Sequence, residues 1–427
     1  MKHLSLASGA LVGALGWVCS AEAETLDIEA VARMAIASGP ELQAAREHAG
    51  AAEAQAKSSG GRLLPSVHLS DEAQEWNKPF IIPQFAAFGP LRDSFTNTFT
   101  VAGRQPLLGL LHGANEYQAA DNNAEAAHAT VKVSEADTRE IVELEFLRLF
   151  QAQARVDIAR TSEQELTQEV TETQARVKAG TQTNADLLRI QVAAAGARQD
   201  GIVAAADVTV HRANLLSAVG RSPEDTSVEF QPPTALLAEA EVRMPVATDA
   251  LSRRPEMKQA VLRAQAADHT ERARAWALLP DVDLEAAYLR VDGQIFAPHD
   301  SAFVGIKADW NIWEWGASYN ARQAAAAEAR AAQADIEATR RRVLTEVTSA
   351  KAELVAAANA VALAKQTITS AQEAYRVTEA QVRAGAGTTT DLLNAESALT
   401  QARLQLENAR YAQAAVRVQL ERAMGGR

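Results

Sequence analysis

The chain contains the same segment twice, about 205 residues apart. Residues 177–188 read VKAGTQTNADLL and residues 382–393 read VRAGAGTTTDLL, and the match extends without a gap to Gly220 and Gly425. The fronts of the two halves match as well, because PEL at 40–42 corresponds to PEM at 255–257. A unit of this length far exceeds the roughly 20–50 residues of a solenoid repeat. The chain is therefore a duplicated half-molecule.

Alanine supplies much of the apolar content. Apolar residues make up 47% of the 427 residues, but aromatic residues only 5%. Because an alanine side chain buries little surface, this composition favours close helix–helix contacts over a large compact core. The formal net charge is −12, which disfavours a nucleic-acid partner, since binding to phosphates requires a basic surface.

The N-terminus has the features of a secretory signal peptide. A short basic start is followed by an apolar stretch and by small residues up to Ala23, which predicts removal of residues 1–23 and a mature chain that starts at Glu24. The apolar stretch is too short for a membrane anchor. Cys19 leaves lipidation open, although Val18 stands where a lipobox has a small residue. Because Cys19 is the only cysteine, the mature chain can form no disulfide.

Alternation of apolar and polar residues predicts two β-hairpins, at about 63–106 and 281–313. In the second hairpin the apolar positions are Val282, Leu284, Ala286 and Tyr288, and then Val304, Ile306, Ala308, Trp310 and Ile312. Each run has about ten residues, the length of a tilted membrane strand. After the signal peptide no 18 consecutive residues are apolar, so no transmembrane helix is expected.

Two features flank the predicted strands. Trp310, Trp313 and Trp315 stand at the end of the last strand, where the aromatic belt of a membrane protein would lie. Residues 76–93, between the strands of the first hairpin, allow two interpretations: a long surface loop, or partial extension of the strands.

Each half also contains an opening amphipathic helix and a much longer one. The opening helices are expected at 26–59 and 251–277, each followed by a Leu-Pro step. The long helices, at about 112–178 and 316–383, contain no proline, and each would span about 100 Å. In the second of them, apolar and small residues recur at alternating spacings of four and three from Val343 to Val382, which indicates a left-handed coil of helices.

Glycines at 180 and 385 break the long helices and predict the tips of two helical hairpins. The returning helix of each hairpin is expected to begin with a capping box, formed by Thr183 and Asp186 in the first half and by Thr388 and Asp391 in the second. The predicted organisation is a first repeat at 24–220, a link at 221–249 and a second repeat at 250–427. The four strands of one chain cannot close a barrel, so several chains would have to share one.

This arrangement resembles the TolC-like outer-membrane factors (outer membrane efflux proteins) over essentially the whole mature chain. The resemblance rests on the two repeats, the Leu-Pro steps, the aromatic-to-glycine exit from the last strand and, above all, the tips. It implies a mainly α fold with membrane β-strands, and a homotrimer with a 12-stranded β-barrel in the outer membrane and a 12-helix α-barrel in the periplasm. It also implies an exit duct for drugs, solvents or metal ions, which a periplasmic adaptor opens and an inner-membrane transporter of the RND or ABC type feeds.

The resemblance also assigns roles at the tips. The residues that would contact the adaptor are Val177, Gly180, Thr181, Val382, Gly385 and Ala386. Asp186 and Asp391 would narrow the periplasmic aperture, and a ring of three Asp391 carboxylates would surround the entrance. Where some members have a second aspartate one turn later, this chain has Arg189 and Asn394, which weakens the case for a double anionic ring. The alternative is that both aspartates serve chiefly as helix caps.

Two other functions remain open at this point. The same fold could serve type I protein secretion, because the duct is passive and the transporter selects the cargo. An exported coiled-coil spacer would explain the heptads but not the paired β-hairpins. No catalytic constellation or phosphate loop is present, and His112, His269 and His299 are scattered, so neither an enzyme, nor a cofactor, nor a metal site is expected.

Overall fold

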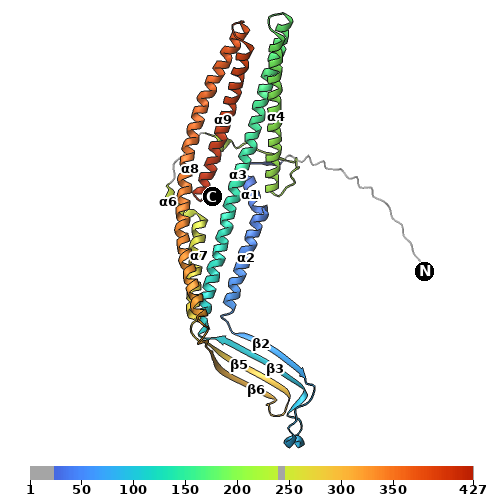
Figure 1. The fold of residues 1–427 in the computed structure, drawn as a ribbon, viewed down its shortest axis with the longest axis vertical. Helices are drawn as coiled ribbons and strands as arrows, with labels where there is room; N and C mark the ends of the chain where they lie inside the picture. Colours follow the sequence, from blue (N-terminus) through green and yellow to red (C-terminus); the bar gives the residue numbers. More distant parts are fainter. Residues whose placement is uncertain (1–23, 239–245, 427) are drawn as a thin grey trace, which may run out of the picture.

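The computed structural model describes residues 24–238 and 246–426. The expected signal peptide, residues 1–23, lies outside these ranges, as does part of the expected link. A four-stranded sheet forms one end of an elongated molecule, and two helical hairpins form the other (Figure 1).

The sheet is made of the two predicted hairpins side by side. Its strands are β2 (Ser66–Glu75), β3 (Arg92–Pro106), β5 (Asp281–Gln294) and β6 (Asp300–Asp309), antiparallel in the order β2-β3-β5-β6. Outside this sheet and its short extension at Phe80, neither β2 nor β6 pairs with another strand of the described residues. Within the described residues, the sheet therefore has two unpaired edges.

The register gives the sheet one apolar and one polar face. Leu69 lies opposite Val101, which in turn lies opposite Tyr288, so these side chains share a face. On the edge strand β6, Val304 and Ile306 point the same way and are 76% and 70% exposed. The other face carries serines, threonines and charged side chains, among them an ion pair of Arg104 with Asp283. This is the two-sided pattern of a strand between lipid and water.

The segment between β2 and β3 is mostly a loop. Strand β2 ends at Glu75, a 3₁₀ helix covers Pro83–Phe88, and β3 starts at Arg92. The Arg92 guanidinium lies 3.6 Å from the centre of the Trp76 ring and ties the two ends of the loop together. The loop interpretation therefore holds for residues 76–91.

The expectation of one opening helix per repeat is wrong. The first repeat has α1 (Ile28–Ser38) and α2 (Pro40–Gly61), and the second has α6 (Ala247–Arg253) and α7 (Pro255–Trp276). Each break falls before a proline: Gly39 and Arg254 have extended ψ angles of 124° and 121°. The proline ring pushes the preceding residue out of the helical region, and proline itself suits the first position of the next helix.

The long helices form two hairpins. Helix α3 (Gly109–Lys178, 70 residues) returns through α4 (Asn184–Ala218), and α8 (Ala317–Arg383, 67 residues) returns through α9 (Thr389–Ala423). Every member of the 3.5-residue seam of α8 is buried or half-buried.

One 18-residue window of α8 has a mean hydropathy of 1.2, so by length and composition alone this helix could cross a membrane, contrary to the expectation that the chain has no transmembrane helix. Alanine raises this mean, and α8 packs along α7 and α9 instead.

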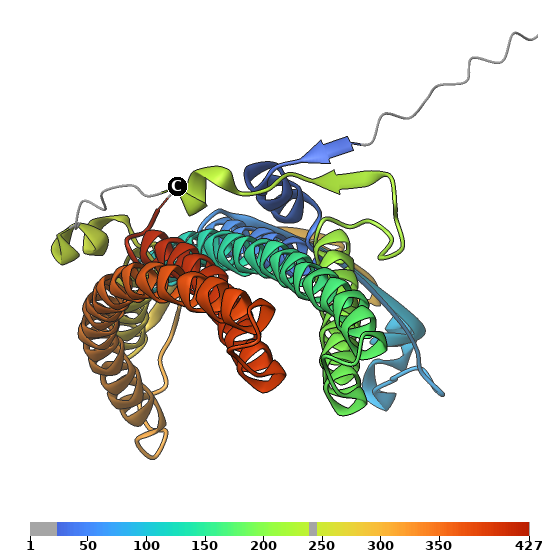
Figure 2. The ribbon, with the colours of Figure 1, turned by 90° about the horizontal axis from the view of Figure 1, so that it is seen from above.

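The first residues and the link cover the outer side of the helices. Strand β1 (Glu24–Leu26) pairs in parallel with β4 (Val228–Phe230), and the short α5 (Thr234–Leu237) follows. Figure 2 shows these elements and α1 on the convex side of a curved layer of long helices. The largest core cluster lies beneath them, around Phe146 and Leu215.

A buried ionic cluster joins the two repeats at mid-height. Arg422 of α9 donates to Asp137 of α3 at 2.6 Å and to Glu256 of α7 at 2.5 Å. Arg254 donates to Glu256 at 3.0 Å and to Glu346 of α8 at 2.7 Å. The two arginine side chains are only 11% and 5% exposed. Four helices are therefore linked through two buried arginines and the buried Glu256, while Asp137 and Glu346 reach the surface.

Candidate functional site

Both hairpin tips have the same backbone geometry. After α3 and α8, Gly180 and Gly385 take left-handed φ angles of 74° and 76°, and the next residues, Thr181 and Ala386, donate backbone hydrogen bonds of 2.9 Å to the last turn of each helix. A Cβ atom at either glycine would meet nothing within 4 Å. Glycine is thus required at the tips by the backbone angle and not by lack of space.

The capping boxes form as the spacing predicts. The Asp186 amide donates to the Thr183 hydroxyl oxygen at 3.2 Å, and the Thr183 hydroxyl donates to the Asp186 carboxylate at 2.6 Å. Thr388 and Asp391 repeat both contacts at the same distances. The threonine hydrogen bonds hold the pKa of each aspartate below its usual range. Both carboxylates are therefore ionised and cap a helix.

The two aspartates differ in their surroundings. Asp186 also pairs with Arg189 at 3.4 Å, and the Thr389 side chain at the start of α9 contributes to the lowering of its pKa. The only partner of Asp391 among the described residues is Thr388, and its side chain is exposed. Asn394 is exposed as well. Of the two aspartates, Asp391 is the one free to face an aperture.

Most of the residues expected to contact an adaptor lie on the surface of the tips. Gly180, Thr181, Gly385 and Ala386 are exposed, and Val177 is half-buried. Val382 is only 7% exposed and packs beneath Gly387, where an added Cβ would lie 3.0 Å from its methyl group. Its side chain supports the turn and presents little surface to a partner.

Sequence reasoning missed the contacts that hold the two hairpins together. Ser162 of α3 donates to Glu396 of α9 at 2.5 Å, and both residues are buried. Arg403 of α9 also binds Glu165 of α3 through two hydrogen bonds of 3.0 and 3.1 Å. The only feature of the sequence that indicates these contacts is the presence of polar residues on largely apolar faces of the helices. Beside these contacts, α3, α4 and α9 enclose a groove of about 540 Å³.

The three tryptophans at the end of β6 are strongly exposed. Trp310, Trp313 and Trp315 are 57%, 75% and 87% accessible, and the last two rings pack edge to face at 5.7 Å. Trp315 has φ = 54°, a left-handed angle that is rare outside glycine. Such exposure is typical of side chains that lie at a membrane interface.

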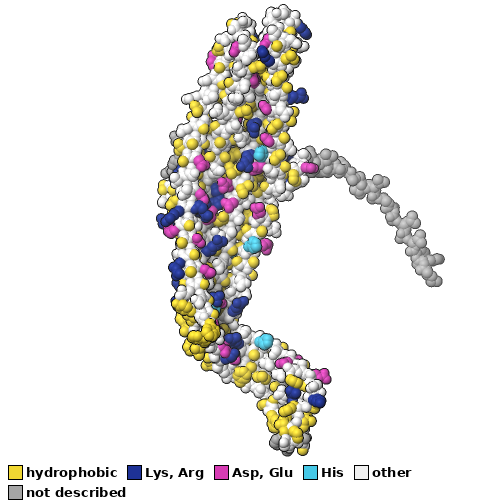
Figure 3. Space-filling model, in the orientation of Figure 1, with side chains coloured by type: hydrophobic (Ala, Val, Ile, Leu, Met, Phe, Trp, Pro, Cys, Tyr) yellow, Lys and Arg dark blue, Asp and Glu magenta, His cyan; other side chains and the backbone are white. Residues whose placement is uncertain are grey.

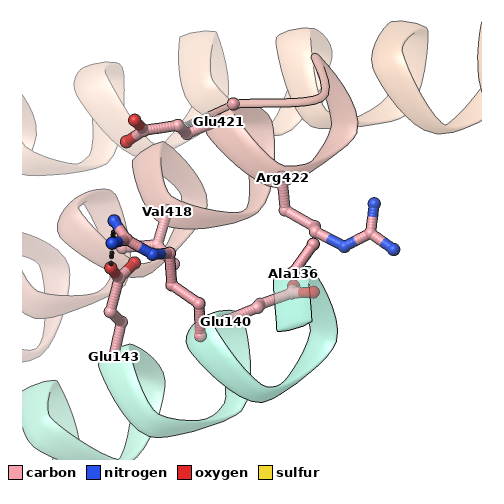
Figure 4. A pocket seen from close by; sticks show the side chains of 8 residues that line it. Ala136, Glu140, Glu143, Val418, Glu421 and Arg422 are labelled. Carbon is pink, nitrogen blue, oxygen red and sulfur yellow. Dashed lines mark ion pairs between the residues drawn. The ribbon is translucent and has the colours of Figure 1, made fainter. Parts of the chain in front are cut away.

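A carboxyl group with strongly perturbed ionisation, that of Glu143, lies between α3 and α9, far from the tips. Glu143 borders a small cavity together with Glu140, Glu421 and Arg422, and its ion pair with Arg139 spans 3.6 Å (Figure 4). Burial raises the pKa of Glu143 to about 7, Arg139 opposes the rise, and Glu421, Glu29 and Glu140 add to it. Within the described ranges, no cluster of His, Cys, Asp or Glu side chains could hold a metal ion.

We expect the stability of the protein to depend on pH through Glu143. Since its pKa is about 7 in the folded chain, against 4.5 for an unperturbed glutamate, only the folded chain holds the proton between these values. The free energy of unfolding should fall by about 1–3 kcal/mol as the pH rises through this window. Glu143→Gln should flatten that part of a melting-temperature profile between pH 5 and 8. Glu337→Gln, at an exposed ion pair of α8, is the control and should leave the slope unchanged; an unchanged slope in Glu143→Gln would contradict the assignment.

Comparison with known proteins agrees with this geometry. The model of the family "Outer membrane efflux protein" matches residues 31–221 and 246–426. The outer membrane efflux protein BepC of Brucella suis biovar 1 (strain 1330) is 22% identical over 319 residues, which cover 74% of this chain and 69% of BepC.

Solved structures show the same fold. The outer membrane protein VceC of Vibrio cholerae superposes with a TM-score of 0.82 at 18% identity, covering 93% of this chain and 96% of VceC. The CmeC outer membrane channel of Campylobacter jejuni superposes with a TM-score of 0.83 at 15% identity, covering 100% of this chain and 94% of CmeC. The chain therefore belongs to the outer membrane efflux protein family and is an outer-membrane protein that extends into the periplasm.

Proposed function

We propose that the protein is the exit duct of a tripartite efflux system and passes small molecules such as drugs, solvents or metal ions to the exterior. The observation that carries this proposal is the four-stranded sheet with one apolar face, one polar face and two unpaired edges. Three copies, each pairing β6 with the β2 strand of the next, would give a closed barrel of 12 strands with its apolar face toward lipid.

The helices support the same assembly. On α4, Leu188, Val192 and Ile202 form an apolar stripe that the described residues of the protomer leave exposed, and a neighbouring chain in a homotrimer would cover it. The tips would then meet a periplasmic adaptor, and an inner-membrane transporter of the RND or ABC type would feed the duct. The family is one of channels and not of enzymes.

Single-channel conductance in planar bilayers, measured together with the mass of the detergent-purified protein, tests the duct. We expect a trimer that gives small, cation-preferring currents. A monomer or dimer without currents would contradict the proposal.

Export of a protein by type I secretion is the second candidate function. Efflux would be favoured if cells that lack the protein lose their tolerance to drugs but still secrete their proteins.

Replacing Asp391 should show whether its charge narrows the aperture. We expect Asp391→Ala to raise the passive conductance severalfold, because a ring of three carboxylates would be lost. Asp391→Asn is the matched variant, since an amide oxygen can still accept the hydrogen bond of the cap while the charge is removed. If the wild type and both variants form stable trimers with equal conductance, Asp391 caps the helix and does not narrow the aperture.

Gly385→Val tests the tip as the adaptor surface. A β-branched residue at φ = 76° is strained by roughly 1–2 kcal/mol and should reshape the turn without a clash. We expect adaptor binding, measured by surface plasmon resonance, to weaken about tenfold or more, equivalent to 1.4 kcal/mol or more. The trimer mass should not change. Gly50→Val, on the exposed surface of α2, is the control, and loss of the trimer in Gly385→Val alone would point instead to a folding role.

A further inference from the structure

Large apolar side chains are exposed around the bend where the helices meet the sheet. They include Leu64, Trp276 and Leu279 as well as Trp313 and Trp315, and all five are at least 40% accessible. Figure 3 shows hydrophobic side chains gathered at this bend, with Lys and Arg side chains beside them on the helical side. In an outer-membrane protein, an apolar surface at the junction of the strands with the helices lies where the strands leave the lipid.

The charges next to this apolar surface are unbalanced at the end of α7. The two carboxylates of α7 nearest this end are already engaged within the chain: Glu271 binds Arg322 at 3.2 Å, and Asp268 accepts from Gln333 at 3.3 Å. Arg272, in contrast, is exposed and forms no hydrogen bond or ion pair with any described residue. A cation that the described part of the chain leaves unpaired thus lies beside a membrane-facing apolar surface.

The helix places Arg272 one turn from Trp276. Residues four apart share a face of an α-helix, so the Cα atom of Arg272 lies about 6 Å further along the helix from the sheet than that of Trp276. Arg274 is also exposed and has no partner among the described residues, but it lies on the opposite side of α7, because two residues correspond to a rotation of about 200°. Of these two arginines, Arg272 therefore shares the face of the interfacial tryptophan.

We propose that Arg272 binds the phosphate of an anionic phospholipid in the periplasmic leaflet, while Trp276 packs against the glycerol and upper acyl region of the same leaflet. A guanidinium donates two parallel hydrogen bonds to a phosphate, and an indole prefers the depth of the headgroups. This inference rests on the proposed duct, because insertion of the sheet sets the depth of α7. The contact fixes how deep the barrel lies and gives the protein a preference for anionic over zwitterionic lipid.

Quenching of tryptophan fluorescence by brominated lipids tests the proposal. The full-length protein is reconstituted in phosphatidylethanolamine vesicles with increasing dibrominated phosphatidylglycerol or, separately, dibrominated phosphatidylethanolamine. A basic side chain at a membrane surface corresponds to a preference of about fivefold for the anionic lipid. We expect wild type and Arg272→Lys to show it, and Arg272→Ala to fall to near equal affinity.

Arg274→Ala is the matched control and should keep the full preference, and 10 mM inorganic phosphate should not compete. An unchanged preference in Arg272→Ala, an equal loss in Arg274→Ala, or competition by free phosphate would each overturn the proposal. Conductance of the same vesicles reports on the duct separately. Channels without a lipid preference would refute only the lipid site, and a preference without channels would refute only the duct.

Discussion

Arg422→Ala is expected to lower the free energy of unfolding by about 3–5 kcal/mol, the usual loss when one partner of a buried ion pair is removed. Burial opposes ionisation of Glu256, yet its hydrogen bond to Arg422 holds the pKa of Glu256 below the usual range. Without Arg422, Glu256 would keep only Arg254 as a cationic partner, and Asp137 would lose the arginine that joins it to Glu256. Thermal unfolding followed by circular dichroism in detergent would show a fall of several degrees in the midpoint.

Arg410→Ala is the matched control for this prediction. Arg410 lies on the same helix, but its side chain is 45% exposed, and its one ion-pair partner in the described part of the chain is Glu407, one turn away. Exposed pairs of this kind contribute less than about 1 kcal/mol, so the midpoint should barely move. Equal shifts in the two variants would show that the central cluster adds no more than a surface pair.

The second large effect is expected from Glu396→Ala, through the contact between the two hairpins. A hydrogen bond to a buried carboxylate contributes about 1.5–3 kcal/mol, so its loss should raise the fraction of molecules with the hairpins apart by about tenfold or more. If the hairpins line the periplasmic entrance as proposed, the passive conductance of the trimer should rise, and cells should become permeable to large antibiotics.

Glu407→Ala separates this effect from a general loss of charge on α9. Glu407 pairs with Arg410 within the helix and reaches no residue of α3 through an ion pair. Its replacement should leave conductance at the wild-type level. Conductance that stays low in Glu396→Ala, in a trimer of normal stability, would show that the Ser162–Glu396 contact does not restrain the entrance.

Much of the fold could be predicted because its determinants are local. Alternation of apolar residues placed both β-hairpins, the 3.5-residue period placed the long helices, and Thr183 and Thr388 marked where the returning helices begin. The wrong prediction of one opening helix per repeat also had a local cause. Pro40 and Pro255 each divide a helix in two, and the amphipathic pattern that continues past them concealed the breaks.

The sequence by itself determined the duplicated architecture, the two hairpin tips and the family, because helix period, strand alternation and capping depend on residues only a few positions apart. Only the tertiary structure decided which polar groups meet. Arg422 lies 285 residues from Asp137, and Ser162 lies 234 residues from Glu396. The pKa of Glu143 is likewise raised mainly by burial beneath α9 and by carboxylates from three helices. Such contacts depend on which helix faces pack together, and the spacing of residues along one helix carries no information about its neighbour.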